Sequence, residues 1–148
     1  MPPQTRERRH ESRYEGVRKV KGKCAYQCRY WLGGSRFAYV QLNLGLFTQS
    51  VWGEDAEWAA GRAWLKFDRL WVADPTTRRW PTPWAIVKEL QRRGIVPRDL
   101  LPMWVRRADG GFIAVSGRGK GAFRLGPFPD PETAHAAMAK ALGRPSIV

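Results

Sequence analysis

The four-residue pattern Leu-Gly-x-Phe occurs twice in this chain, beginning at Leu44 and again at Leu125. Each copy ends a series of short segments in which apolar and polar residues alternate between glycine-containing turns. Such series are typical of antiparallel strands joined by hairpins. An alanine-rich segment with helical spacing follows each copy. The repeat therefore constrains the chain to two similar units, each with three strands followed by a helix.

In the first unit we predict strands at residues 16–20, 23–31 and 36–44, with turns at Lys21-Gly22 and at residues 33–35. A helix is expected over residues 53–70, because apolar residues recur there at the three- and four-residue intervals of one helix face. That series consists almost entirely of alanine, so this face of the helix is flat and can lie close against a sheet. Its members are Ala56, Ala59, Ala60, Ala63 and Phe67.

A second helix is predicted in the connector, where Thr82 can cap it, Pro83 opens it and Gly94 ends it. The second unit then has predicted strands at 103–107, 112–116 and 122–125, and a helix that Asp130 caps. The fold class expected is α+β, with two sheet units joined by a helical linker. The predicted division is a basic arm at 1–13, a first unit at 14–70, a linker at 71–102 and a second unit at 103–148.

The charge indicates a polyanionic partner. The chain has 26 Lys and Arg against 13 Asp and Glu, which gives a formal net charge of +13 and a pI near 10.7. The excess lies in residues 1–30 and 76–148, whereas 31–75 is close to neutral. Two basic blocks around a neutral one are typical of nucleic-acid binding rather than of a uniformly basic tail.

Other protein classes find little support in the sequence. No apolar run approaches the length of a membrane span, and the polar N-terminus does not have the pattern of a secretory signal. The two cysteines, Cys24 and Cys28, lack metal-ligand spacing, so we expect small buried thiols in a reducing compartment, the cytoplasm with its nucleoid or the nucleus. We predict no metal, no cofactor and no enzymatic activity, because paired carboxylates in a pocket and a nucleophile–base pair are both missing. His135 is expected to be structural.

The motifs of the two units resemble the DNA-binding domain of the APETALA-two/ethylene-response-factor class, which also occurs in proteins of bacterial mobile elements. That family begins with Tyr-Arg-Gly-Val-Arg, continues through Gly-Lys-Trp, and ends its third strand with Trp-Leu-Gly-x-Phe before an alanine-rich helix. The resemblance covers about residues 14–68 and 103–142. In the first unit it rests on Tyr14, Gly16, Val17, Arg18, Gly22, Lys23, Ala25, Arg29, Leu44, Gly45 and Phe47; in the second, on Val105, Arg106, Arg107, Phe112, Ala114, Leu125, Gly126 and Phe128.

The resemblance implies a three-stranded sheet that lies in the major groove of duplex DNA, which admits a β-ribbon. Strand alternation places Cys24, Tyr26 and Cys28 toward the helix and Ala25 on the opposite face. The family's base-contacting positions fall on that opposite face too, with side chains that base edges favour. They are Arg18, Gln27, Arg29, Gln41 and Asn43. Phosphate contacts are predicted at Lys19, Lys21, Lys23, Arg36, Arg106, Arg107, Arg118, Lys120 and Arg124.

Departures from the family limit what it implies about the target. Glu15 and Val20 replace two arginines of its first strand, and Gln27 replaces an acidic residue. The family's usual GC-rich target is therefore not expected here. In the second unit the corresponding face is apolar, with Ile113 and Val115 among its residues, so it could touch thymine methyl groups or pack on protein.

The aromatic residues at the second hairpin, Tyr30, Trp31, Phe37 and Tyr39, are expected to pack rather than to stack on bases. Sequence-specific duplex binding, in regulation or in a mobile element, is the function expected. RNA or ribonucleoprotein binding and a protein-interaction role for the second unit stay open.

Overall fold

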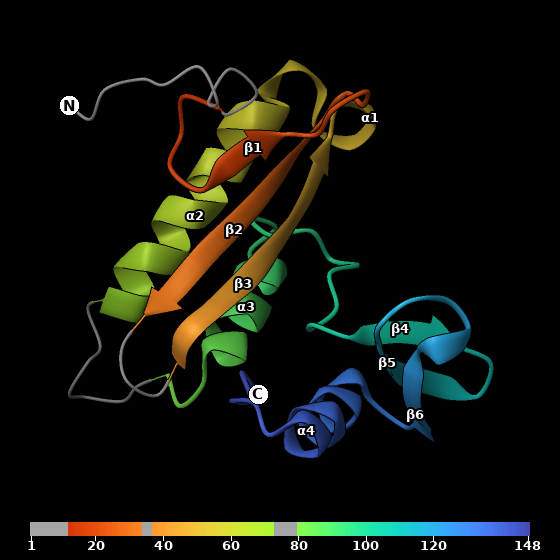
Figure 1. The fold of residues 1–148 in the computed structure, drawn as a ribbon. Helices are drawn as coiled ribbons and strands as arrows, with labels where there is room; N and C mark the ends of the chain where they lie inside the picture. The colour runs from red at the N-terminus through yellow and green to blue at the C-terminus, as the bar shows by residue number, and fades with distance from the viewer. Residues whose placement is uncertain (1–11, 34–36, 73–79) are drawn as a thin grey trace.

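The computed structural model describes residues 12–33, 37–72 and 80–148, which form two antiparallel three-stranded sheets with helices packed on them (Figure 1). This confirms the expected α+β class with two sheet units. The first sheet has the order β1-β2-β3 and the second the order β4-β5-β6. The first comprises β1 (Val17–Lys19), β2 (Ala25–Gly33) and β3 (Phe37–Thr48). The second comprises β4 (Val105–Ala108), β5 (Gly111–Ser116) and β6 (Phe123–Phe128).

The long helix α2 (Ala56–Val72) covers one face of the first sheet. The five residues predicted to form its flat face are all buried. They lie in one core with the inward side chains of the strands, Val17, Cys28, Tyr30 and Leu42 among them. The Tyr30 hydroxyl also donates to Asp68 Oδ1 of α2 at 2.6 Å, which fixes the helix along β2. The small alanine side chains allow the helix to approach the sheet this closely.

The start of this helix differs from the prediction of one continuous element at 53–70. A four-residue helix α1 (Gln49–Trp52) and a short 3₁₀ turn, η2 (Gly53–Asp55), precede α2. Gly53 has φ +62°, which an α-helix cannot contain, so it ends α1 and redirects the chain. The predicted apolar spacing on α2 is confirmed, whereas the predicted start at Gly53 is wrong, because α2 begins at Ala56.

Strand β3 continues to Thr48, four residues beyond the predicted end at 44. The cause is a β-bulge: Cys28 pairs with Gly45 and Arg29 with Asn43, so Leu44 has no partner on β2. Gly45 has φ +121°, and a Cβ there would lie 2.8 Å from the Pro97 ring. The Leu-Gly pair of the repeated pattern is thus a bulge in the strand and not its end.

Helix α3 (Pro83–Arg92) begins as predicted, because the Thr82 hydroxyl accepts a hydrogen bond from the backbone N–H of Ala85. Its position is more specific than the predicted linker, because its buried side chains belong to the core of the first unit. Trp84, Ile86, Val87 and Leu90 are buried in the same core as the first sheet and α2. The connector is therefore an integral layer of the first unit.

The second unit is smaller. Helix α4 (Pro131–Leu142) starts at an Asp130 cap, whose carboxylate accepts from the Thr133 N–H at 2.7 Å. Its buried residues Ala134 and Met138 pack against Val105 and Ala114 of the sheet. A short 3₁₀ turn, η3 (Gly119–Gly121), lies in the glycine-rich loop before β6.

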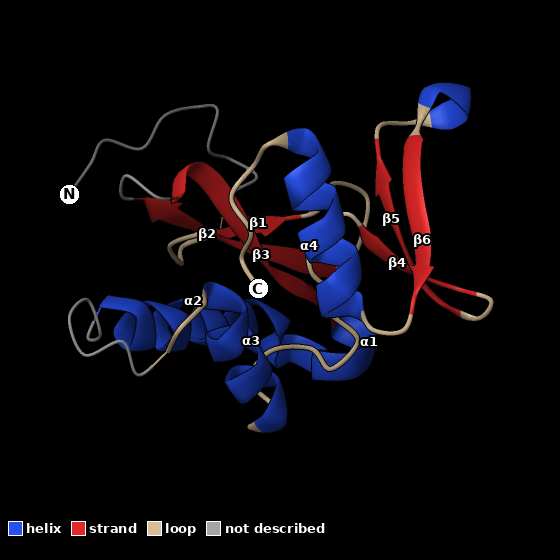
Figure 2. Cartoon of the chain, turned by 90° about the horizontal axis from the view of Figure 1, so that it is seen from below, coloured by secondary structure: helices blue, strands red, loops and turns tan. Residues whose placement is uncertain are grey.

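The C-terminal segment joins the two units. The carbonyl of Ile147 accepts from the Trp84 N–H at the start of α3, and the side chain of Ile147 belongs to the first core. Glu132 of α4 accepts from the Trp84 indole at 3.1 Å and pairs with Lys88 at 3.2 Å. Figure 2 shows α4 standing between the two sheets, so the second unit projects beside the first.

Candidate nucleic-acid interface

The outer face of the first sheet, the face opposite α2, carries all five predicted base-reading residues. Arg18 lies directly across from Gln27, and Arg29 from Asn43. Gln41 pairs with Trp31, two residues along β2 from Arg29, which places it on the same face. Directly paired residues of antiparallel strands share a face, so the register brings together the four residues that alternation placed there and adds Arg18, which the resemblance alone had indicated.

Two of these side chains are already held by hydrogen bonds. Gln27 Nε2 donates to Asn43 Oδ1 and also to the Gly45 carbonyl at 3.2 Å, while the Gly45 N–H donates to Asn43 Oδ1 at 3.0 Å. Asn43 Oδ1 therefore accepts from the backbone N–H at the bulge. Because this oxygen is occupied, Asn43 cannot form the pair of hydrogen bonds by which an Asn side chain recognises adenine. The Asn43 Nδ2 donor and the Gln27 Oε1 acceptor take part in none of these bonds, so the two side chains together offer one donor and one acceptor.

The inward row differs from the prediction at the start of β2. Cys24 is exposed and Ala25 is buried to 2% exposure, the reverse of the alternation. Cys24 precedes the strand, which begins at Ala25, so strand alternation does not apply to it. Cys28 is fully buried as predicted, and burial raises the pKa of its thiol to about 12. A thiol with that pKa stays protonated and unreactive at neutral pH.

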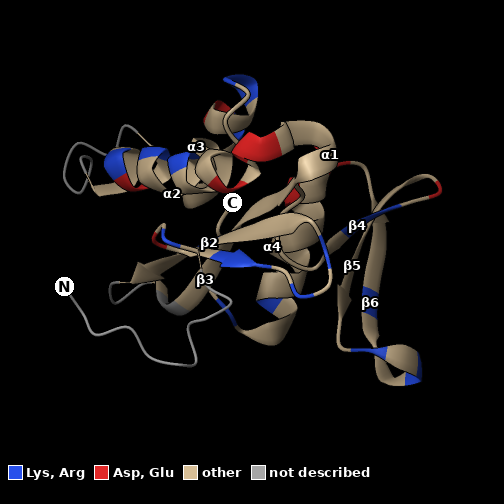
Figure 3. Ribbon diagram, turned by 90° about the horizontal axis from the view of Figure 1, so that it is seen from above, with Lys and Arg blue, Asp and Glu red and all other residues tan. Residues whose placement is uncertain are grey.

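Charge is distributed unevenly between strands and helices. None of the described strands contains Asp or Glu, although they contain Arg18, Lys19, Arg29, Arg106, Arg107 and Arg124. The described acidic residues lie on helices and in turns, Glu57 and Asp68 on α2 and Glu89 on α3 among them. Figure 3 shows this division. Both sheets therefore present basic charge that no carboxylate on the strands offsets.

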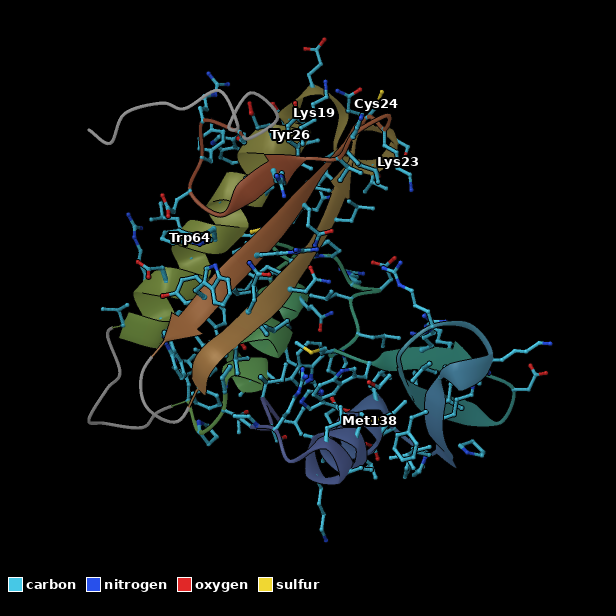
Figure 4. The ribbon with its side chains drawn as sticks, in the orientation of Figure 1. Lys19, Lys23, Cys24, Tyr26, Trp64 and Met138 are labelled. Carbon is cyan, nitrogen blue, oxygen red and sulfur yellow. The ribbon has the colours of Figure 1, made fainter. Side chains whose placement is uncertain are left out.

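The lysines predicted to contact phosphate cluster at one end of the first sheet. Lys19 ends β1, and Lys21 and Lys23 follow in the exposed turn before β2. Figure 4 shows Lys19 and Lys23 at the end of the sheet that lies away from α4. They form a basic edge beside the polar outer face.

The second sheet does not hold its predicted arginines on one face. Arg106 pairs with Ile113 and Arg124 with Val115, which places both arginines on the outer face of this sheet. Arg107 pairs with Phe112 and lies over that ring at 5.4 Å, on the α4 side. Neighbouring residues of a strand point to opposite faces, so Arg106 and Arg107 cannot serve one surface.

The other predicted phosphate contacts fall in two groups. Arg118 and Lys120 are exposed in and beside η3. Arg36 and most of the basic arm lie outside the described residues; Arg13, at the end of the arm, forms an ion pair with Glu57 at 3.4 Å.

A groove with a volume of about 720 Å³ lies where the outer face of the first sheet meets the second unit. Gln27, Arg29, Gln41 and Asn43 line one side of it. The other side comes from Met103, Trp104, His135, Arg144, Pro145 and Ile147. The sequence did not indicate Trp104 or Arg144 as site residues, because only contacts between the units bring them to this face.

The aromatic residues near the groove divide between packing and exposure. Tyr30 and Phe37 are buried, as predicted. Trp31 was expected to pack too, but its side chain is 61% exposed and lines the groove. The prediction for Trp31 was wrong because its pairing with Gln41 assigns it to the outer face. The side chain of Tyr39 lies outside the described part of the structure.

Within the described part of the chain, no three His, Cys, Asp or Glu side chains gather as metal ligands would. Among the same residues, no helix combines the length and apolar character needed to cross a membrane. The fold and the site define a small α+β protein with two sheet units and a basic, polar sheet face beside a groove. The chain matches no family model, no curated protein and no solved structure.

Proposed function

We propose that this chain binds double-stranded DNA by laying the outer face of its first sheet in the major groove. The observation that carries the proposal is the common face of Arg18, Gln27, Arg29, Gln41 and Asn43, on a sheet whose strands contain no acidic residue. A major groove about 12 Å wide accepts a β-ribbon, and Arg, Asn and Gln match the donors and acceptors of base edges.

In this proposal the outer face reads bases and the basic edge positions the sheet. Arg29 can donate two hydrogen bonds to guanine, since the one bond of its side chain within the described residues, to Gln41 Oε1, is long at 3.4 Å. The Asn43 donor and the Gln27 acceptor can together engage one base edge. Lys19, Lys21 and Lys23 contact phosphates at the end of the sheet, and their contribution does not depend on sequence.

The resemblance to the APETALA-two/ethylene-response-factor class supports the same mode of binding. The second unit contributes less to reading in this proposal, because its outer face has Ile113 and Val115 between its two arginines. Arg106 and Arg124 then hold the phosphate backbone that flanks the site. A regulatory or mobile-element role follows if the target is a defined sequence.

Selection from a pool of random duplexes tests the proposal. We expect the wild type to enrich one sequence motif. We expect Arg29→Ala to enrich the same motif with a changed preference at one position. Competition with an RNA duplex and with single-stranded RNA completes the test. A chain that prefers RNA over every DNA duplex contradicts the proposal.

A further inference from the structure

The groove beside the first sheet has features that reading a perfect duplex does not require. Its volume of about 720 Å³ falls within the range of about 300–1,000 Å³ typical of sites for small molecules. A space of that size can hold a single base with its sugar. Met103, Trp104 and Arg144 form its far side, and none of them lies on the reading face.

The exposed indole of Trp31 offers a stacking surface at the groove. An aromatic side chain that is 61% exposed beside Arg29 and polar amides is the combination by which proteins hold unpaired bases. Stacking requires no particular base, because every base has a π-face. The other groove tryptophan, Trp104, already stacks on His135, with ring centroids 5.0 Å apart and planes inclined by 19°.

Trp104 is held in an unusual backbone conformation. Its φ is +73°, the one positive value among the described non-glycine residues. A bulky residue is seldom found there, and such strain persists where surrounding contacts fix it. The Trp104 carbonyl accepts from the Val115 N–H at 2.8 Å, and its ring packs on His135. Trp104, on the far side of the groove, is therefore held in place by contacts within the protein.

The charge of the groove suits a phosphate-linked ligand. Two arginines, Arg29 and Arg144, line it from opposite units, and none of the lining residues is acidic. Among the described residues neither arginine forms a salt bridge. A base that entered the groove would bring its phosphate near Arg144, on the side that the second unit supplies.

We propose that this groove holds one unpaired base of the bound DNA, stacked on Trp31, with Arg144 on its phosphate. The preferred target is then a duplex that contains an unpaired base, such as a bulge. This inference rests on the proposed function, because the paired flanks occupy the reading face and the basic edge. A base that is already unpaired is favoured, since it avoids the cost of leaving the stack.

The test compares two duplexes of equal sequence, one perfect and one with a single bulged 2-aminopurine. The full chain is used as wild type, as Trp31→Ala and as the matched control Trp58→Ala, whose indole is 52% exposed on α2, behind the sheet. We expect the wild type to prefer the bulged duplex and to quench its fluorescence. Trp31→Ala should lose about 5- to 150-fold of affinity for the bulged duplex, the size of one stacking contact, and clearly less for the perfect duplex.

The outcomes separate this inference from the proposed function. Equal binding of both duplexes by the wild type, or an equal loss on both in Trp31→Ala, overturns the groove proposal and leaves duplex reading intact. If neither duplex binds but a single-stranded oligonucleotide containing 2-aminopurine is bound and quenched through Trp31, duplex reading fails and base capture stands. DNA and RNA versions of that oligonucleotide identify the preferred sugar.

Discussion

The backbone N–H of Ile147 donates a hydrogen bond to Nε2 of the His135 ring across 3.2 Å, joining the C-terminal segment to α4. Because Nε2 accepts this bond, the other ring nitrogen carries the proton and donates to the Met103 carbonyl at 3.0 Å. The bond from Ile147 needs a neutral ring, because a protonated Nε2 cannot accept, whereas the bond to Met103 persists in either form. The same Ile147 accepts from Trp84 in the first unit, so His135 is part of the contact that holds the two units together.

Acid should weaken this contact. Burial holds the pKa of His135 below its ordinary value, so the unfolded chain binds a proton more readily than the folded one. The stabilising contribution is complete above about pH 6.5 and is lost as pH falls from there toward the lowered folded pKa. We expect the free energy of unfolding, measured with urea, to decrease between about pH 7.5 and about pH 5.5. In His135→Gln the decrease should be smaller; an identical pH profile in the variant contradicts this role.

Gly16 should be essential to the first unit. It has φ +70°, and a Cβ there would lie 2.2 Å from the Trp64 ring and 2.5 Å from the Arg29 carbonyl. We expect Gly16→Ala to lower the free energy of unfolding by about 2–4 kcal/mol, from the unfavourable backbone conformation and the overpacking together. Gly121→Ala is the matched control, since nothing lies within 4 Å of a Cβ at that position and its φ is not positive. Equal unfolding curves for the two variants would show the packing at Gly16 to be unimportant.

Asn43→Asp separates the structural part of Asn43 from its part in reading. Asp keeps the oxygen that accepts from the Gly45 and Gln27 N–H groups, so the bulge and thermal stability should change little. It removes the Nδ2 donor and adds negative charge to the face that meets DNA. We therefore predict a DNA affinity at least about tenfold lower, as for loss of one base contact. Unchanged affinity in a filter-binding titration would remove Asn43 from the interface.

Lys21 should contribute to affinity without contributing to sequence preference. Loss of one phosphate contact reduces the slope of log K against log salt by about one. We expect Lys21→Ala to weaken binding to all duplexes evenly and to give that smaller slope. Lys66→Ala, on α2 behind the sheet, makes the same charge change and should keep the wild-type slope. Equal slopes in all three proteins would rule out a phosphate contact at Lys21.

Much of the fold followed from local sequence signals. Thr82 and Asp130 capped their helices as predicted, because a capping side chain acts on residues three positions away. Period alone predicts the alanine series on α2 and the outward positions of Gln27, Arg29, Gln41 and Asn43, whereas Arg18 follows from the resemblance. The bulge at Leu44 has no local signal of its own, because a glycine after an alternating run indicates a strand end equally well, and the predicted strand is therefore four residues shorter than β3.

The groove could not be predicted in this way. Its far side depends on contacts between residues far apart in the chain, such as Ile147 with Trp84 and His135 with Met103. No local pattern indicates which face of the first unit the second unit will approach. The error at Trp31 has another origin: Trp31 lies two residues beyond Arg29 in β2, so alternation already indicates the outer face, and the expectation of packing from its aromatic character is wrong.

The central claim is that the outer face of the first sheet reads duplex DNA, and Arg29 tests it most directly. Affinity for the duplex selected by the wild type is measured for Arg29→Ala and for Arg62→Ala, which removes the same charge from the exposed side of α2. We predict that Arg29→Ala loses about 1–3 kcal/mol on that duplex and discriminates less at one base pair, while Arg62→Ala stays near wild type. An equal loss in both variants, or a loss from Arg29→Ala that is the same on every sequence, would contradict the claim.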